Sequence, residues 1–192
     1  MTAVSTTIDK FDVSTIGGNA PDEIKRLLGN PRAFWATFLK PGQRPLNSFG
    51  KAISDRMKVT ELSIISKAEE PNKLEGRAVL ELEVWEDMVN NGGNIHGGCS
   101  AFLIDMASTF ALTVLNVYET GKVHPSVSQA LNVVYHSPAA IGEKLRLVNT
   151  TLTIGKRAES VRTEIWNVTH RRLVASGVHI KMLPSPPPPP KL

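Results

Sequence analysis

Residues 97–117, GGCSAFLIDMASTFALTVLNV, decide the fold, and Asp105 is the only charged residue among them. Almost every other position is apolar or small, so an α-helix over this stretch has no face that prefers water. Such a helix must be covered nearly all round by the rest of the protein. The glycines at positions 97 and 98 follow His96, and we expect the helix to begin there.

Strand-forming segments lie on both sides of this helix. Leu80, Leu82 and Val84 alternate with charged residues, which predicts a half-buried strand. The expected strands are residues 59–65, 79–85, 127–135, 144–154, 159–168 and 173–182. In the last of these, the face that carries Val178 and Ile180 is predicted to be buried. Two strands, one apolar helix and four strands predict an α+β fold, in which an antiparallel sheet wraps around one long central helix.

The two ends of the chain differ in composition from this middle part. Residues 1–20 are polar and are predicted to be disordered. Residues 21–56 are predicted to be a helical N-terminal extension, and residues 57–183 the folded domain. Residues 184–192 contain five consecutive prolines and are predicted to be a polyproline tail.

The overall composition narrows the class of protein. The 22 Lys and Arg residues are scattered, which gives no nucleic-acid-binding module, and 41% hydrophobic residues allow a sizeable core. Asp105 interrupts the longest apolar run, so we expect no membrane span. With one cysteine and no cluster of metal ligands, we expect an intracellular protein without a metal. Cytoplasmic and mitochondrial locations are both open, and the terminal Pro-Lys-Leu only distantly resembles a peroxisomal signal.

Asp105 and the residues before the helix are the candidates for chemistry. Burial on an apolar helix would raise the pKa of Asp105 toward the range of a general base. His96, Gly97 and Gly98 stand where backbone N–H groups lack internal partners and suit a developing oxyanion. The sequence leaves a structural alternative open for each. Asp105 is then a carboxylate that caps a helix or pairs with a nearby loop, and the two glycines only form a tight turn before the helix.

Other polar residues allow further interpretations. Cys99, three residues after His96, is either an activated thiol at a helix N-terminus or a small buried side chain. Asn90 and Ser128 are able to orient a water or a carbonyl. The turn Gly155-Lys156-Arg157 offers cations to phosphates, or is simply solvated.

Residues 90–105, NNGGNIHGGCSAFLID, resemble the central signature of the hotdog-fold thioesterases. The similarity is greatest to the branch that holds the phenylacetate-pathway thioesterases and the animal thioesterase superfamily member 2 proteins. It covers roughly residues 57–183, and it continues through VSQALNVVYHSPA (127–139), IGEKL (141–145), IGK (154–156) and ASGVHIK (175–181). It implies a single hotdog domain that hydrolyses a fatty or aryl acyl-CoA to free acid and CoA, with no cofactor.

The resemblance also implies roles for individual residues. Asp105 is then the general base or nucleophile, and the Gly97 amide binds the thioester oxygen. Asn90 and His96 position the thioester, and Ser128 holds the attacking water. The residues implied in CoA binding are Tyr135, His136, Ser137, Pro138, Gly155, Lys156 and Arg157.

Helix geometry predicts an oligomer. Gly98 and Asp105 share one face of the helix but lie ~10 Å apart along its axis, at about 1.5 Å per residue. A water and the carbonyl that it attacks span only ~3 Å. Two antiparallel helices are therefore expected to supply the two ends of one site, in a homodimer or a dimer-of-dimers tetramer. Trp35 and Phe38 of the extension are candidates for capping the acyl pocket.

Three other functions are alternatives to thioester hydrolysis. An enoyl-CoA hydratase of the same fold is disfavoured, because its usual Asp–His pair in a loop–helix motif is absent. A non-catalytic acyl-CoA-binding protein would have no need of Asp105. An acyltransferase would depend on an activated Cys99.

Overall fold

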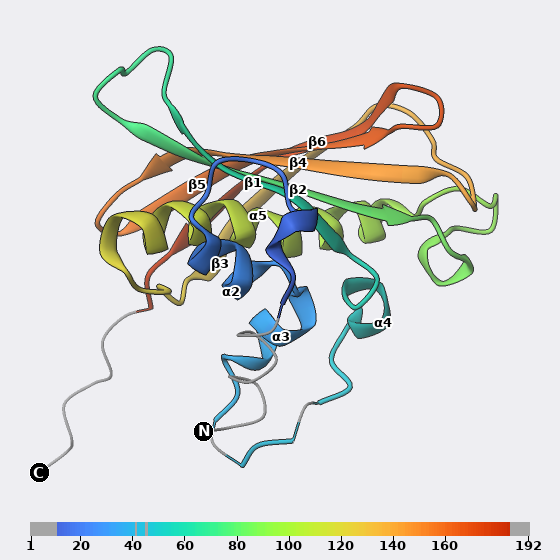
Figure 1. Ribbon diagram of the computed structural model, residues 1–192. Coiled ribbons are helices and arrows are strands. Elements are labelled where there is room, and N and C mark those ends of the chain that lie inside the picture. The colour runs from blue at the N-terminus through green and yellow to red at the C-terminus, as the bar shows by residue number, and fades with distance from the viewer. Residues whose placement is uncertain (1–10, 41, 45, 185–192) are drawn as a thin grey trace, which may run out of the picture.

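A six-stranded antiparallel sheet forms one layer of the molecule, in the order β1-β2-β4-β5-β6-β3. The computed structural model describes residues 11–40, 42–44 and 46–184. The strands are β1 (Lys58–Ser66), β2 (Leu74–Glu83), β3 (Val127–Tyr135), β4 (Lys144–Ile154), β5 (Ala158–Asn167) and β6 (Arg172–Met182). The sheet curves over the long helix α5 (Gly97–Thr120), as Figure 1 shows. The predicted α+β architecture is confirmed.

Helix α5 packs closely against the concave side of the sheet. Leu103, Ile104 and Ala107 are completely buried in this contact. A side chain at Gly76 of β2 would place its Cβ 2.3 Å from the carbonyl oxygen of Ala111. Glycine at position 76 therefore lets the strand and the helix approach each other.

By length and composition alone, α5 is apolar enough to cross a membrane, although it contains Asp105. However, 67% of its most apolar window is buried inside the single chain. The apolar composition is accounted for by burial against the sheet and the extension, as in the core helix of a globular fold.

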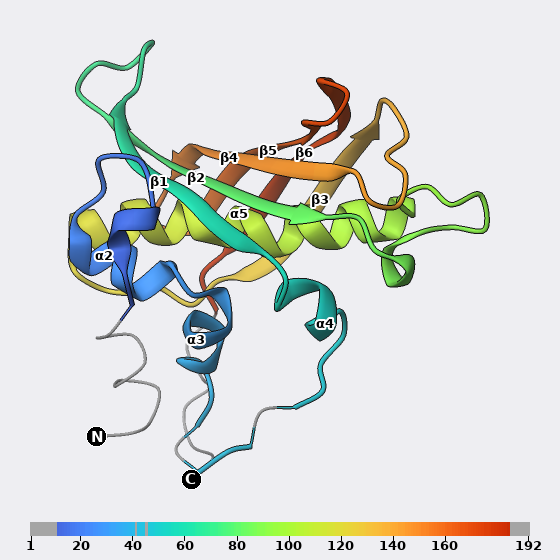
Figure 2. The same cartoon turned by 45° about the vertical axis from the view of Figure 1, so that its right-hand side comes forward.

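The N-terminal extension forms a further layer on the side of α5 that faces away from the sheet (Figures 1 and 2). Its aromatic residues make the contact, since the Phe34 and Phe110 rings lie 5.2 Å apart. Ile24 and Leu28 are also buried there. The short helical elements outside α5 are η1 (Val13–Thr15), α2 (Asp22–Leu28), α3 (Pro31–Ala36), α4 (Lys51–Ser54) and η2 (Glu86–Met88).

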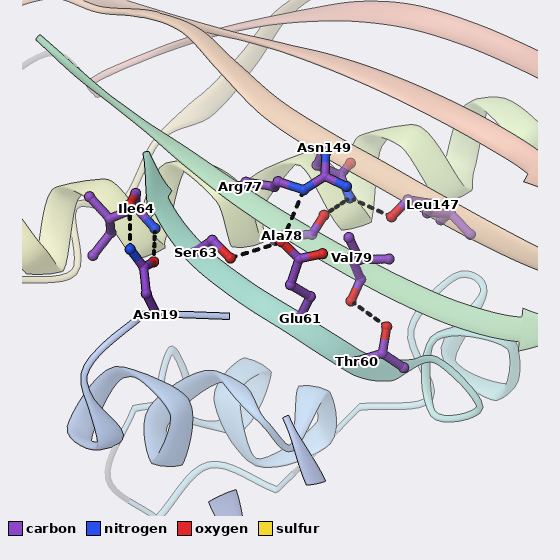
Figure 3. A network of polar contacts seen from close by, with 10 residues as sticks. All are labelled: Asn19, Thr60, Glu61, Ser63, Ile64, Arg77, Ala78, Val79, Leu147 and Asn149. Carbon is purple, nitrogen blue, oxygen red and sulfur yellow. Dashed lines mark hydrogen bonds and ion pairs between the residues drawn. The ribbon is translucent and has the colours of Figure 1, made fainter. Parts of the chain in front are cut away.

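The outer edge of β1 is covered by the segment that follows η1. The Gly17 N–H donates a 2.9 Å hydrogen bond to the Thr60 carbonyl. The Asn19 side chain accepts a 2.7 Å bond from the Ile64 N–H and donates a 2.8 Å bond to the Ile64 carbonyl (Figure 3). Gly18 has a φ of 88°, a conformation that favours glycine. These contacts close one of the two edges of the sheet.

The prediction of disorder for residues 1–20 is wrong for residues 11–20. The polar composition suggested a solvated segment, but its hydrogen bonds are made with β1, far away in the sequence. Residues 1–10 and residues 185–192 of the predicted polyproline tail lie outside the described residues.

Strand β3 forms the other edge of the sheet, and this edge is open. Among the described residues, β3 pairs only with β6. Val127, Val134 and Tyr135 are at least half exposed in the single chain. An open strand edge with apolar side chains is a template for pairing with another strand.

The predicted buried face of β6 is wrong. His179 and Lys181 point toward α5 and are buried, whereas Ile180 lies on the outer face and is 36% exposed. The alternation of apolar residues suggested the opposite arrangement. The prediction is wrong because α5 presents hydroxyl groups to this strand. The polar side chains of β6 form their hydrogen bonds with these hydroxyls inside the protein, and the apolar side chains lie on the outer face.

Candidate active site

The N-terminus of α5 presents hydrogen-bond donors. His96 caps the helix, and its Nδ1 accepts a 2.9 Å hydrogen bond from the Gly98 N–H. In the neutral form, the ring therefore carries its proton on Nε2. The Gly97 N–H donates to no protein acceptor within residues 11–40, 42–44 and 46–184. The partial positive charge at the helix start makes this free N–H suitable for an oxyanion.

Asn90 contributes a third donor beside the helix start. Its Oδ1 accepts a 2.9 Å hydrogen bond from the Gly92 N–H, which orients the amide. Its Nδ2 donates to no acceptor in the described part of the chain. A bridge between Val89 and Ile95 closes the loop and holds Asn90 next to His96. Three predicted site residues are thus brought together at this end of α5.

Asp105 lies two turns further along α5 and meets strand β3. Its Oδ1 accepts a 2.9 Å hydrogen bond from the Ser128 hydroxyl, so a second pair of predicted residues is brought together. The Asp105 side chain is 41% exposed in the single chain. The expected burial of this carboxylate is therefore wrong for the chain alone, because Asp105 lies at the open edge of the sheet beside Ser128 of β3.

A buried polar cluster stands behind Asp105. The His179 Nε2 lies 3.3 Å from the Asp105 Oδ1, and the His179 Nδ1 lies 2.7 Å from the Ser108 hydroxyl. The Lys181 ammonium donates a 2.8 Å hydrogen bond to the Thr109 hydroxyl. Sequence reasoning missed this cluster. The only indication of the cluster in the sequence is that His179 and Lys181 stand at alternate positions of a largely apolar segment.

Burial determines the protonation of this cluster. It lowers the pKa of His179, and nearby Lys181 lowers it further, while Asp105 acts in the opposite direction. Burial also lowers the pKa of Lys181, opposed by Asp105 and Glu159. The His179 Nε2 is buried and has no hydrogen-bond partner among the described residues.

The predicted CoA-binding residues fall at two different ends of the sheet. The Tyr135 hydroxyl donates a 3.1 Å hydrogen bond to the Gly97 carbonyl, so residues 135–138 lie at the helix N-terminus. The turn 155–157 lies at the other end, since Ala158 of β5 and Val127 of β3 both pair with Met182. One chain does not bring these two segments together.

Comparison with known proteins identifies the family of the chain. The family model described as "Thioesterase superfamily" matches residues 92–174. The mouse (Mus musculus) protein acyl-coenzyme A thioesterase 13 is 35% identical over 123 residues, which are 64% of this chain and 80% of the relative. The chain belongs to the thioesterase superfamily. It is a thioester hydrolase.

Solved structures show the fold of this thioesterase. The zebra fish thioesterase superfamily member 2 has a TM-score of 0.59 and 28% identity, with 86% of this chain and 99% of that chain covered. A hypothetical thioesterase protein with coenzyme A from Streptococcus pneumoniae has a TM-score of 0.51 and 18% identity, with 57% and 79% covered. The predicted hotdog fold and the predicted branch of the family are both confirmed.

The cysteine of the thioesterase is not activated. Burial, with a smaller effect of the nearby Asp87 carboxylate, raises the pKa of Cys99 to about 11. The thiol is therefore protonated at neutral pH. The His96 Nδ1 accepts a hydrogen bond from the Gly98 N–H, so this nitrogen is not free to take a proton from the thiol. These contacts argue against Cys99 as a nucleophile.

The described residues of the thioesterase contain no group of three or more His, Cys, Asp or Glu side chains that would hold a metal ion. The polar groups at both ends of the site are instead arranged for hydrogen bonding and proton transfer.

Proposed function

We propose that this thioesterase hydrolyses fatty or aryl acyl-CoA in sites shared by two copies of the chain. In each site Asp105 of one copy is the general base, and the Gly97 amide of the other is the oxyanion donor. The separation of these groups carries the proposal. They are eight residues apart on one helix, which is about 12 Å at about 1.5 Å per residue.

Gly97 and Asp105, two turns apart on α5, each carry half of the required chemistry. The Gly97 end has the three free donors and Tyr135. The Asp105 end has Ser128 and, at the same end of the sheet, the basic turn 155–157. Neither half is a complete site, because one lacks a base and the other lacks an oxyanion donor.

Strand β3 provides the way to join the halves. Ser128 and Tyr135 stand near its two ends, about 23 Å apart at about 3.3 Å per residue. Antiparallel pairing of β3 with its copy, about a two-fold axis near the middle of the strand, sets the Ser128 end of one beside the Tyr135 end of the other. The exposed apolar residues of β3 support such a dimer.

The proposed reaction needs only these groups. Ser128 donates its hydrogen to Asp105, so its lone pairs are free to accept a hydrogen bond from water. The water oxygen attacks the thioester carbon, and its proton passes to Asp105. The Gly97 N–H binds the resulting oxyanion. Collapse of this intermediate breaks the carbon–sulfur bond, and the proton passes from Asp105 to the sulfur of CoA.

His179 is proposed as a positioning residue for Asp105. The Ser108 hydroxyl donates to the Asp105 carbonyl, so the His179 Nδ1 is the donor in its contact with Ser108. Nε2 of a neutral His179 then presents a lone pair to Asp105 at 3.3 Å. When Asp105 takes the proton of the water, that lone pair is available to accept a hydrogen bond from it.

The basic turn is proposed to meet the phosphates of CoA. Lys156 and Arg157 are exposed and belong to the Asp105 half of the site. The similarity in fold to a thioesterase solved with coenzyme A supports a CoA site on this scaffold. His136 and Ser137 are already bonded to β6, so we assign them a role in shaping the other side of the site.

The test is release of free thiol from a panel of acyl-CoAs by wild type and by Asp105→Asn. Loss of a positioned base is expected to reduce kcat by ~10²–10⁴. Acyl-CoA binding, measured by calorimetry, is expected to remain. Activity within a few-fold of wild type would remove Asp105 from the mechanism, and binding without turnover in the wild type would favour a non-catalytic binding protein.

A further inference from the structure

We propose that residues 47–53 of the N-terminal extension form one wall of the acyl-binding site, and that Phe49 and Phe102 are its specificity-determining contacts. The ligand is the apolar acyl group of the thioester, so this inference rests on the proposed function. These residues of the extension lie outside residues 92–174, which match the family model.

A groove of about 570 Å³ separates this segment from the start of α5. We call it the extension groove. Residues 47–53 line one side, and the other side includes His96, Gly98 and Phe102. Its volume lies within the range of about 300–1,000 Å³ that is typical of small-molecule sites. The lining therefore includes the two chain neighbours of Gly97, although not Gly97 itself.

The position of the groove indicates which part of the substrate enters it. Tyr135 covers one side of Gly97, where an added Cβ would lie 3.3 Å from the ring. Residues 135–138, which are assigned to the CoA side, continue in that direction. The extension groove is lined by the next residue, Gly98, and its lining contains none of residues 135–138. With the carbonyl at Gly97 and CoA beside Tyr135, the acyl group is directed into the groove.

The chemistry of the groove suits an apolar group. The Phe49 and Phe102 rings meet edge to face, with centroids 5.4 Å apart and planes at 84°. The charged groups near the groove are already paired. Lys51 forms an ion pair with Asp55. Asp87 forms one with Arg56 at 2.6 Å. No unpaired cation of the lining is available to attract phosphates in the described structure.

The contact between the extension and α5 depends on one glycine. Gly50 has a φ of 64°, and a Cβ at this position would lie 2.3 Å from the Phe102 ring. Only glycine allows the backbone to turn here and approach the ring so closely. The turn brings Phe49 against Phe102 rather than leaving it in a free loop.

Phe49 is largely exposed in the single chain. It is 86% exposed, although one side of its ring contacts Phe102. Covering an aromatic ring with an apolar ligand is favourable, because apolar surface leaves water. The Trp35 and Phe38 rings, which the sequence suggested as a cap, pack instead with Phe34 and Phe110. Of the aromatic residues of the extension, Phe49 is thus the one placed on the groove.

The test compares two thioethers that the enzyme cannot hydrolyse, S-butyl-CoA and S-dodecyl-CoA. Their dissociation constants are measured by calorimetry for wild type, Phe49→Ala, Phe49→Leu and the control Phe38→Ala. The wild type is expected to prefer the dodecyl compound by at least tenfold. Phe49→Ala should lose most of this preference with less than a twofold change for the butyl compound, and Phe49→Leu should retain most of it. Phe38→Ala should behave as wild type.

Two results would overturn the proposal. One is an unchanged preference in Phe49→Ala. The other is a change in oligomeric mass, measured by light scattering, with the preference intact, which would show that Phe49 contacts another copy instead. The thioether measurement needs no turnover, so it is independent of the Asp105→Asn assay. Failure of the proposed mechanism and failure of the acyl wall therefore give different results.

Discussion

The Ser128 hydroxyl donates a 2.9 Å hydrogen bond to the Asp105 carboxylate, and this bond ties the open edge strand β3 to the central helix. Any copy of the chain that pairs with β3 comes close to Asp105 as well. The edge that we propose to form the dimer and the carboxylate that we propose as the base are therefore joined by this hydrogen bond. The extended edge of the sheet on the other side, β1, is closed by the chain's own residues.

Two inactive variants are expected to restore activity together. Asp105→Ala lacks the base, and the double variant Asn90→Ala with His96→Ala lacks the positioning donors. In a mixed dimer, one site contains all of the substituted residues and the other site contains none of them. After joint unfolding and refolding, thiol release should reach about a quarter of wild type for random pairing. Native mass spectrometry must show hybrids, and hybrids without activity would assign both ends of the site to one chain.

Asn90→Asp is expected to reduce kcat/KM by ~10²–10³, as for the loss of an oxyanion donor. The change replaces the free Nδ2 donor with an acceptor, while the Oδ1 that binds the Gly92 N–H remains. Asn91→Asp, one residue further along the same loop, is the matched control for added charge. Steady-state thiol-release assays compare the two variants. Equal effects would mean that loop charge, rather than the Asn90 donor, matters.

His179→Gln is expected to weaken the dependence of stability on acid pH. Burial lowers the pKa of His179 from its ordinary value of 6.5, so the folded state keeps the ring neutral where the unfolded chain gains a proton. The wild type therefore loses stability as pH falls below 6.5, by about 1.4 kcal/mol for each pKa unit of the shift. Lys181 and Asp105 are the charged groups that face this ring.

Urea unfolding at about pH 7.5 and about pH 5.5 measures this effect as the difference between the two free energies of unfolding. That difference should be smaller in His179→Gln than in wild type, whereas the control His124→Gln should keep the wild-type difference. A variant that loses as much stability as wild type on acidification would show that His179 is not held neutral.

Asn19→Ala is expected to lower the free energy of unfolding by about 1–3 kcal/mol, because it removes two hydrogen bonds of about 0.5–1.5 kcal/mol each. Both bonds join Asn19 to the backbone of Ile64 on β1 (Figure 3). Asn72→Ala, in an exposed loop, is the control. Urea unfolding measures the free energy of unfolding of both variants. Equal values for Asn19→Ala and Asn72→Ala would mean that the segment around Asn19 contributes little to stability through its contact with β1.

The sequence alone determined the core of the fold and the identity of the chemical groups. An apolar helix with a single charge requires cover on nearly all sides, and alternation in the flanking segments required a sheet to provide it. Asp105 was conspicuous because it interrupts that helix. The glycines after His96 indicated free N–H groups for the same kind of local reason.

Only the tertiary structure decided which side chains meet. His179 and Lys181 are inside because hydroxyls on a distant helix satisfy them, and periodicity alone does not record such a partner. Residues 11–20 are ordered because β1 accepts their hydrogen bonds. A turn at Gly50 places the Phe49 ring in contact with the Phe102 ring, and the residues around Gly50 in the sequence do not predict this contact. Local patterns follow from backbone periodicity and burial, whereas contacts between distant segments depend on how the whole chain packs.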